Sequence, residues 1–206
     1  MITIVDFGAG NMRSIENALE RIGTPVRIAA TPEAVASADA LILPGVGAAA
    51  PAMARLRERK LAAQIVDAIA NGVPFLGICL GMQLLFERSA EDGASCLGVF
   101  PGSVERMVTT EKLPHVGWNT IDVTRPHPVL SPLDGEAMYF VHSYAVVPAN
   151  RDLIIAETSH GGPFVSAIAA DQVVAVQFHP ERSGQAGLRL LESFVRFAGV
   201  GAAHVA

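Results

Sequence analysis

The sequence predicts an α/β fold in which a mostly parallel central sheet is flanked by helices. In the first half of the chain, short and almost continuously apolar segments alternate with helical segments, which is typical of parallel strands buried on both faces. These predicted strands are residues 2–5, 25–29, 40–43 and 74–78. From residue 97 to about 178, short strand-like segments separated by turns, the longest at 137–147, indicate antiparallel or mixed strands added to that core.

Apolar side chains at helical spacing, with capping residues at the ends, predict helices between these strands. One short helix follows Thr31, because threonine caps a helix and Pro32 suits its first turn. A longer helix ends at Asn71-Gly72. The predicted helices are residues 11–22, a short segment from 31, 48–70, 80–88 and 183–197, and we expect the end of the chain, 199–206, to fray.

Composition limits the classes of function. The chain has 206 residues, of which 50% are hydrophobic and 17% charged, so we expect a single domain over residues 1–206 with a sizeable core. The net charge of −5 argues against binding nucleic acid or an anionic membrane surface, and no apolar run is long enough for a membrane span. Two cysteines without a CxxC pair argue against a disulfide scaffold or a thiolate metal site, and we expect a cytoplasmic protein.

The segment DFGAGNMRS (6–14) has two of the glycines of a dinucleotide-binding turn but does not complete the pattern. Arg13 stands where a third glycine is required, and no acidic residue ends the second predicted strand. We therefore interpret Gly8 and Gly10 as parts of a tight strand-to-helix turn, with Asn11 as the helix cap.

Cys79 lies between two glycines in the segment GICLG. A lone cysteine is usually a buried and inert small hydrophobe. Here, however, a buried strand ends at Ile78 and a helix begins near Leu80, so Cys79 occupies the turn, and the glycines permit a sharp corner. This is the logic of the G-x-S-x-G nucleophile elbow with sulfur in place of oxygen. The main-chain amide of Leu80 could then serve as an oxyanion donor.

The best partner for a reactive thiolate is the histidine of the segment QFHPERSG (177–184). A leaving group needs a proton donor, and His179 follows an apolar strand, which places it at the carboxyl edge of the sheet, where ligands bind. Pro180 favours an extended His179, so Glu181 points to the same side and can hydrogen-bond the imidazole. The three residues form a Cys-His-Glu arrangement by role. A structural histidine is the alternative, which this geometry disfavours.

Other polar residues could complete such a site. His142 in YFVHSYA is a rival base, but no carboxylate lies two residues away, and we expect it to line the site. The loop ILPGVG could turn an amide near Val46 inward as a second oxyanion donor. Gln83 lies one helical turn beyond Cys79 and could contact a substrate, and Glu91 could bind an ammonium group. For both, exposure to solvent is the simpler interpretation from sequence alone.

Together these motifs resemble those of the class I (triad) glutamine amidotransferases. GICLGMQLL and QFHPERSG carry the resemblance, and DFGAGNMRS, PHVGWN and YFVHSYA narrow it to the glutaminase subunits of imidazole glycerol phosphate synthases. The five motifs occur in the family's order and span nearly the whole chain. The resemblance implies a flavodoxin-like arrangement of the sheet. It also implies hydrolysis of L-glutamine through a thioester, without a metal or an organic cofactor.

The resemblance also implies a role for each matching residue. Cys79 would be the nucleophile, His179 the general acid and base, and Glu181 its orienting partner. The main-chain amides of the oxyanion hole would belong to Leu80, Val46 and Gly47. The glutamine pocket would be lined by Gly45, Gln83, Glu91, His142, Ser143 and Tyr144. The residues that face a partner protein would be Asn11, Trp118 and Arg182.

That partner would be a (β/α)8 cyclase subunit in a heterodimer. It would use ammonia to make imidazole glycerol phosphate and an aminoimidazole carboxamide ribotide in histidine biosynthesis. Two alternatives remain open at this point. The same chemistry could feed another synthase, of the anthranilate or pyridoxal phosphate type, or the chain could be a catalytically silent partner protein that has kept the fold.

Overall fold

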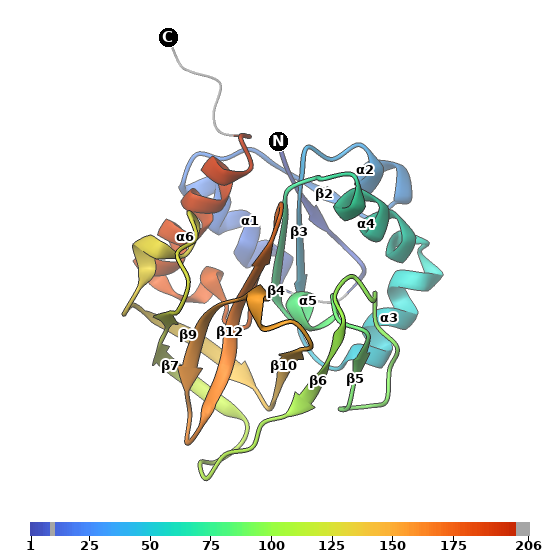
Figure 1. Ribbon diagram of the computed structural model, residues 1–206. Helices are drawn as coiled ribbons and strands as arrows, with labels where there is room; N and C mark the ends of the chain where they lie inside the picture. Colours follow the sequence, from blue (N-terminus) through green and yellow to red (C-terminus); the bar gives the residue numbers. More distant parts are fainter. Residues whose placement is uncertain (9–10, 201–206) are drawn as a thin grey trace.

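A sheet of eight strands runs through the molecule with helices on both sides (Figure 1). The computed structural model describes residues 1–8 and 11–200, so Gly10 in the first turn and most of the terminal segment expected to fray lie outside the described residues. The predicted α/β fold is confirmed. The strands of the first half are parallel, and antiparallel strands are added by the second half.

The central sheet is parallel over five neighbouring strands and antiparallel over the other three. Its order is β2-β1-β3-β4-β13-β12-β11-β8, and the parallel part, from β2 to β13, has the 2-1-3-4-5 order of flavodoxin-like sheets. The strands are β1 (Ile2–Val5), β2 (Val26–Ala29), β3 (Ala40–Gly45), β4 (Phe75–Cys79), β8 (Asp122–Val123), β11 (Ile154–Ser159), β12 (Pro163–Ala170) and β13 (Val173–Val176).

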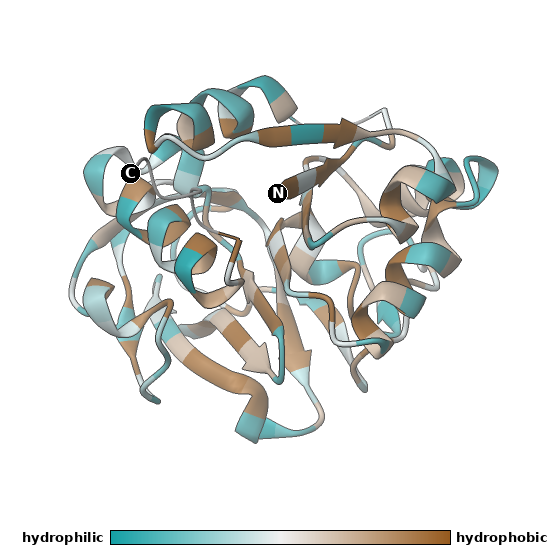
Figure 2. Cartoon of the chain, turned by 90° about the horizontal axis from the view of Figure 1, so that it is seen from above, coloured by the Kyte–Doolittle hydropathy of each residue, from teal (hydrophilic) through white to brown (hydrophobic). Residues whose placement is uncertain are grey.

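Helices cover both faces of this sheet because alternate residues of a strand point to opposite sides. Helices α1 and α6 share one hydrophobic cluster with Ile2 and Ile4, whereas α2, α3 and α4 share the other with Val5. Figure 1 shows the two groups on opposite sides, and Figure 2 shows strands that are mainly hydrophobic between helices of mixed character. The helices are α1 (Met12–Arg21), α2 (Pro32–Ala36), α3 (Ala49–Glu58), α4 (Leu61–Ala70), α5 (Leu80–Gln83) and α6 (Gly184–Phe197).

Two small sheets are added to this core and lie in the lower half of Figure 1. One has the order β10-β6-β5 and the other pairs β7 with β9. Their strands are β5 (Arg88–Ser89), β6 (Gly102–Arg106), β7 (His115–Thr120), β9 (Ala137–His142) and β10 (Tyr144–Pro148). Three short 3-10 helices complete the list of elements, namely η1 (Ser131–Leu133), η2 (Arg151–Leu153) and η3 (Pro180–Arg182).

Two helix predictions are wrong in extent. The helix expected over 80–88 is the single turn α5, after which the chain turns into the short strand β5. The helix expected over 48–70 is two helices, because Lys60 adopts a left-handed backbone conformation (φ 57°) between them. The apolar spacing does not reveal the first break, because Leu84 and Phe86 remain completely buried beyond the end of the helix.

Strand predictions in the second half of the chain differ from the structure at two places. The segment PHVGWN, not predicted as a strand, supplies most of β7. The segment expected as one strand over 137–147 is broken at Ser143, because β9 pairs with β7 whereas β10 pairs with β6 in another sheet. This break places the chain around Ser143 at the pocket described below.

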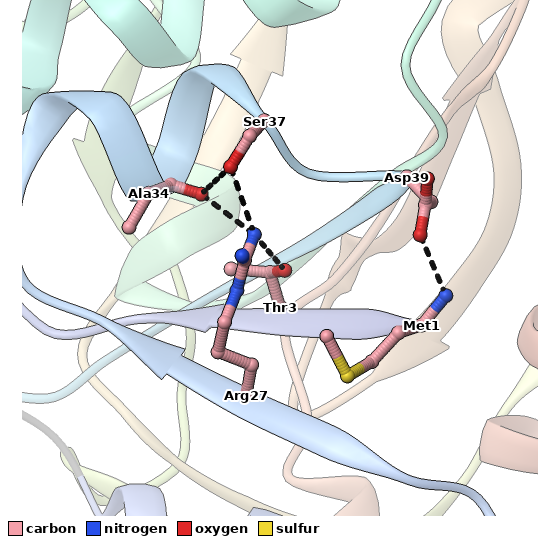
Figure 3. A network of polar contacts seen from close by, with 6 residues as sticks. All are labelled: Met1, Thr3, Arg27, Ala34, Ser37 and Asp39. Atoms are coloured by element: carbon pink, nitrogen blue, oxygen red, sulfur yellow. Dashed lines mark hydrogen bonds and ion pairs between the residues drawn. The ribbon is translucent and has the colours of Figure 1, made fainter.

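Polar contacts fix the β2 edge of the central sheet (Figure 3). The guanidinium Nη2 of Arg27 on β2 donates to the hydroxyl of Thr3 on β1 and to the carbonyl of Ala34 in α2. The amino terminus of Met1 lies 2.9 Å from the carboxylate of Asp39, and this hydrogen bond holds the pKa of Asp39 below its usual value. These contacts join the first strands to α2 and lie apart from the candidate site.

Candidate active site

Three parallel strands end together at the carboxyl edge of the central sheet. Gly45 on β3 lies opposite Cys79 on β4, and Val176 on β13 lies opposite Ile78. Cys79 is the last residue of β4, and His179 follows shortly after β13. The structure therefore brings Cys79 and His179 to the edge where open α/β sheets bind their ligands.

Cys79 occupies a strained corner between strand and helix. Its backbone angles are φ 54° and ψ −110°, and the next residue, Leu80, begins α5. A non-glycine residue held in a sparsely populated conformation is destabilised by about 1–3 kcal/mol, and such strain clusters at active sites. The helix that follows is one turn long, so its dipole is small.

The corner is packed too closely for side chains at the flanking glycines. A Cβ atom at Gly81 would overlap the carbonyl oxygen of Leu43 and lie 2.9 Å from its carbon. A Cβ atom at Gly77 would lie 3.0 Å from main-chain atoms of Gly81 and Met82. The two glycines therefore allow α5 to pack directly against β3 and β4, and this packing holds the conformation of Cys79.

A buried His-Glu pair lies beside the cysteine. Nδ1 of His179 is 2.8 Å from Oε1 of Glu181, and the two side chains are only 4% and 3% exposed. Burial lowers the pKa of His179, but the neighbouring Cys79 and Glu181 outweigh burial and raise that pKa to about 10. The imidazole is therefore protonated at neutral pH and can give a proton to a leaving group.

The chain around His179 fixes the imidazole. His179 has an extended backbone (φ −106°, ψ 95°), as a residue before proline should. Its N–H donates to the carbonyl of Tyr139 at 2.9 Å, and its own carbonyl accepts from the hydroxyl of Ser183 at 2.6 Å. Nε2 of His179 is buried and makes no hydrogen bond with any of the described residues. Because His179 also lines the pocket, this nitrogen is free to serve a substrate.

A pocket of about 300 Å³ opens over the sulfur. Its walls come from six parts of the chain: the loop after β3, the corner with α5, the segment around Glu91, the residue before β7, the ends of β9 and β10, and the segment after β13. The lining residues are Val46, Gly47, Ala48, Cys79, Leu80, Gln83, Glu91, Pro114, Val141, His142, Ser143, Tyr144 and His179. Of the residues assigned to catalysis or glutamine binding, only Gly45 and Glu181 do not line it. Gly45 packs under Leu80, where a Cβ atom would lie 2.9 Å from that side chain, and Glu181 contacts His179.

Two pocket residues make hydrogen bonds to the same carbonyl. Nε2 of Gln83 lies 3.1 Å from the carbonyl oxygen of Tyr144, and Nδ1 of His142 lies 2.9 Å from it. A carbonyl accepts only, so both nitrogens are donors. Burial lowers the pKa of His142 to about 4, so its imidazole is neutral at pH 7. His142 therefore lines the pocket as a neutral imidazole, whereas His179 is protonated.

Glu91 supplies a carboxylate to the pocket wall. Burial and the neighbouring charge of Asp92 raise the pKa of Glu91. A cation placed beside the carboxylate would counter both effects.

The three residues predicted to face a partner lie outside the pocket. Trp118 on β7 is 57% exposed and meets the ring of Tyr139 edge-on, with centroids 6.2 Å apart. The guanidinium of Arg182 lies over the same ring, 5.6 Å from its centroid. Asn11 precedes α1, which packs against η3, the element that contains Arg182. Asn11 makes no side-chain cap hydrogen bond, contrary to the expected capping role.

Sequence reasoning missed four residues of the site. Ala48, Pro114 and Val141 line the pocket, and Gln177 contacts the sulfur of Cys79. A signal for Gln177 was present, because it lies two residues before His179 and alternate residues of an extended chain point to the same side.

The described residues lack two features, a metal-binding cluster and a membrane-spanning helix. Within residues 1–8 and 11–200, no cluster of three or more His, Cys, Asp or Glu side chains is arranged to hold a metal ion. In the same part of the chain, no helix combines the length and the apolar character that crossing a membrane requires.

Comparison with known proteins identifies the class. Residues 3–197 match the family described as glutamine amidotransferase class-I. A solved structure, described as the crystal structure of glutamine amidotransferase, has a TM-score of 0.78 at 21% identity and covers 97% of this chain and 100% of its own. The chain belongs to the class I glutamine amidotransferase family.

Its relatives define the subgroup. The imidazole glycerol phosphate synthase subunit HisH of Chloroflexus aurantiacus is 45% identical over 204 residues, which cover 96% of each chain. The HisH subunit of Salinibacter ruber is 47% identical over 94% of this chain and 93% of its own. The chloroplastic imidazole glycerol phosphate synthase hisHF of Arabidopsis thaliana is 44% identical over 95% of this chain but only 34% of the plant protein. Within the class, this chain belongs with the HisH subunits of imidazole glycerol phosphate synthase.

Proposed function

We propose that this chain is the glutaminase subunit of an imidazole glycerol phosphate synthase, which hydrolyses L-glutamine to glutamate and ammonia for histidine biosynthesis. The observation that supports this most strongly is the buried His179–Glu181 pair beside Cys79, which sits at a strained corner in a pocket. A nucleophile, a base and a group that orients the base are the parts that amide hydrolysis through a thioester requires.

In the first half of the reaction, the sulfur of Cys79 attacks the side-chain amide carbon of glutamine. A C–S bond forms and the carbonyl oxygen becomes an oxyanion. Nε2 of the protonated His179 gives its proton to the amide nitrogen, the C–N bond breaks and ammonia leaves. Glu181 keeps the imidazole oriented through the 2.8 Å contact at Nδ1.

In the second half, water replaces the departed ammonia. The now neutral Nε2 of His179 takes a proton from this water as its oxygen attacks the thioester carbon. The C–S bond breaks, glutamate leaves, and the sulfur of Cys79 returns as a thiolate beside a protonated imidazole. The pocket wall at Leu80, Val46 and Gly47 supplies the main-chain amides for both oxyanions.

The remaining pocket residues suit the amino-acid end of glutamine. Glu91 provides a carboxylate for the α-ammonium group. The break between β9 and β10 at Ser143 exposes main chain of Ser143 and Tyr144 to the α-carboxylate. His142, being neutral, adds no second charge near the reacting amide.

A cyclase subunit, predicted to be a (β/α)8 protein, is the proposed partner in a heterodimer. Ammonia is useful only while it remains unprotonated and is not lost to water, so its producer and its consumer should be in contact. The plant relative supports this, because this chain matches only 34% of hisHF. Most of that longer protein is therefore available for a second domain. Trp118, Tyr139 and Arg182 offer an exposed aromatic and cationic surface for the contact. The two free cysteines fit a cytoplasmic location.

The function is tested by measuring glutamate release with and without the cyclase subunit of the same organism and its nucleotide substrate. We expect the two subunits to purify together, and we expect the complete mixture to release glutamate roughly tenfold faster, a typical size for coupling between two sites. Stimulation by an anthranilate or pyridoxal phosphate synthase instead would contradict the assignment. So would the absence of turnover under every condition, which would indicate a catalytically silent partner.

The division of roles between His179 and Glu181 leads to a separate prediction. We expect His179→Ala to lower kcat/KM by about a thousandfold, a typical contribution of general acid–base catalysis, and Glu181→Gln to lower it less. Without the carboxylate charge, the pKa of His179 should fall from about 10 towards its usual value. The protonated imidazole is then lost at lower pH, so the alkaline limb of the pH–rate profile should move to lower pH in Glu181→Gln. An equal or larger loss for Glu181→Gln than for His179→Ala would show that this division is wrong.

A further inference from the structure

Gln177 is completely buried next to the catalytic cysteine. It directly follows β13, and its main-chain N–H donates to the carbonyl of Ser166 on β12 at 2.9 Å, which fixes its backbone. Burying an amide is unfavourable unless its hydrogen bonds are made, so a glutamine at 0% exposure needs an explanation. Both ends of its side chain make hydrogen bonds, one of them to a reacting atom.

The direction of these hydrogen bonds follows from one main-chain carbonyl. Nε2 of Gln83 lies 3.1 Å from the carbonyl oxygen of Tyr144, which can only accept, so this atom is correctly the amide nitrogen. The same nitrogen lies 3.0 Å from Oε1 of Gln177. Reversing the Gln177 amide would place two nitrogen donors against each other.

The amide nitrogen of Gln177 therefore has a fixed direction. Nε2 of Gln177 lies 3.5 Å from the sulfur of Cys79 and donates a hydrogen bond to it. Among the described residues, Gln177 is the one whose side chain donates a hydrogen bond to that sulfur, since Nε2 of His179 makes no hydrogen bond.

We propose that Gln177 is a positioning residue that donates to the sulfur of Cys79 and stabilises its thiolate form, with Gln83 and the carbonyl of Tyr144 fixing the direction of the donor. The inference rests on the proposed function, in which Cys79 is the nucleophile. It also assigns Gln83 a second role. Besides lining the pocket, the amide of Gln83 holds the side chain of Gln177 in the direction that lets it donate to the sulfur.

Such a donor acts at two points of the reaction. Hydrogen bonds to charged groups are stronger than those to neutral groups, so the donor raises the fraction of molecules with a thiolate. It also stabilises the sulfur when it leaves the acyl carbon in the second half of the reaction. The titratable side chains around the sulfur, from all the elements that line the pocket, are His179, His142, Tyr144 and Glu91. Replacing Gln177 removes the amide donor and leaves these four titratable side chains in place, so the effect of the donor can be measured separately from theirs.

The test is the pH dependence of alkylation of Cys79 by iodoacetamide. A Cys96→Ser background removes the second thiol, whose pKa burial raises to about 11. In this background, Gln177→Met keeps the length of the side chain without a donor. Gln177→Glu keeps the acceptor for Gln83 and places a carboxylate against the sulfur. Ser166→Ala is the matched control, because the carbonyl of Ser166 accepts from the main chain of Gln177, whereas its buried hydroxyl has no hydrogen-bond partner among the described residues.

We expect the midpoint of the alkylation profile to move to higher pH by about one unit in Gln177→Met and at least as far in Gln177→Glu, with kcat/KM roughly tenfold lower in each. Ser166→Ala should keep the parent profile. If both Gln177 variants kept the parent alkylation profile, the proposal would be overturned. A purely structural role would lower stability without moving the midpoint, so a thermal melt of each variant separates a structural role from a positioning role. Failure of the proposed function would look different: excess glutamine would then leave Cys79 of the parent protein unprotected from alkylation.

Discussion

Replacing Cys79 with alanine should abolish glutamine-dependent synthesis by the complex, while synthesis driven by added ammonia continues. Alanine fits the corner but has no nucleophile, so we expect glutamine turnover to fall at least about a thousandfold, as when the nucleophile of a hydrolase is removed. In the proposed heterodimer the cyclase site is on the other subunit and should keep its ammonia-dependent rate. The measurement is product formation from glutamine and from ammonium salt, at matched concentrations of the complex.

The cysteine away from the pocket provides the control for this experiment. Cys96 is half-buried and does not line the pocket, so Cys96→Ala should retain most of the glutamine-dependent rate. Substantial glutamine turnover in Cys79→Ala would rule out Cys79 as the nucleophile. Loss of the ammonia-dependent rate as well would indicate a folding or assembly defect rather than a catalytic one, and size-exclusion chromatography of the complex would detect it.

Replacing Gly81 with alanine should strongly destabilise the protein through a single added methyl group. The new Cβ would overlap the carbonyl oxygen of Leu43 on β3, and backbone cannot move aside as a flexible side chain can. Overpacking of a tight interior usually destabilises by 1–3 kcal/mol, and we expect about 3 kcal/mol here. The free energy of unfolding from urea titration measures it.

A second glycine separates crowding from backbone strain. Gly72 has φ +77° and no heavy atom within 4 Å of an added Cβ, so Gly72→Ala introduces a left-handed alanine without a clash. We expect it to destabilise by about 1–2 kcal/mol, less than Gly81→Ala. In Gly81→Ala, displacement of α5 should also lower the alkylation rate of Cys79, whereas Gly72→Ala should leave it unchanged. A smaller loss of stability for Gly81→Ala than for Gly72→Ala would show that α5 can shift at little cost.

The parts of the site that could be predicted from sequence are those determined by neighbouring residues. The corner at Cys79 depends on two glycines and a change from strand to helix, all within five residues of sequence (77–81). The His179–Glu181 contact depends on extended chain before Pro180, which is again local. The parallel core followed from apolar segments alternating with helices, and its order was confirmed.

The remaining parts depend on contacts between segments that are distant in the chain. The length of α5 is decided by tertiary packing, which keeps the residues that follow it completely buried although the helix has ended. The direction of the Gln177 amide depends on Gln83 and Tyr144, which come from two other elements. Val141 joins the pocket because the strand ends at His142, and nothing in the local pattern marks that end. No local rule could place these residues.

The position of β13 in the sheet has a consequence for synthesis on the ribosome. This strand is the last along the chain, yet it lies between β4 and β12, so the two are not joined until residues 173–176 have emerged. Until then β4 presents an apolar, unpaired edge that can pair with another chain, and Cys79 has no proton donor. A chain that ends before residue 173 therefore exposes an edge prone to aggregation and, under the proposed mechanism, lacks the acid that glutamine hydrolysis requires. Insertion of one short strand closes the sheet and brings His179 to Cys79 in the same step.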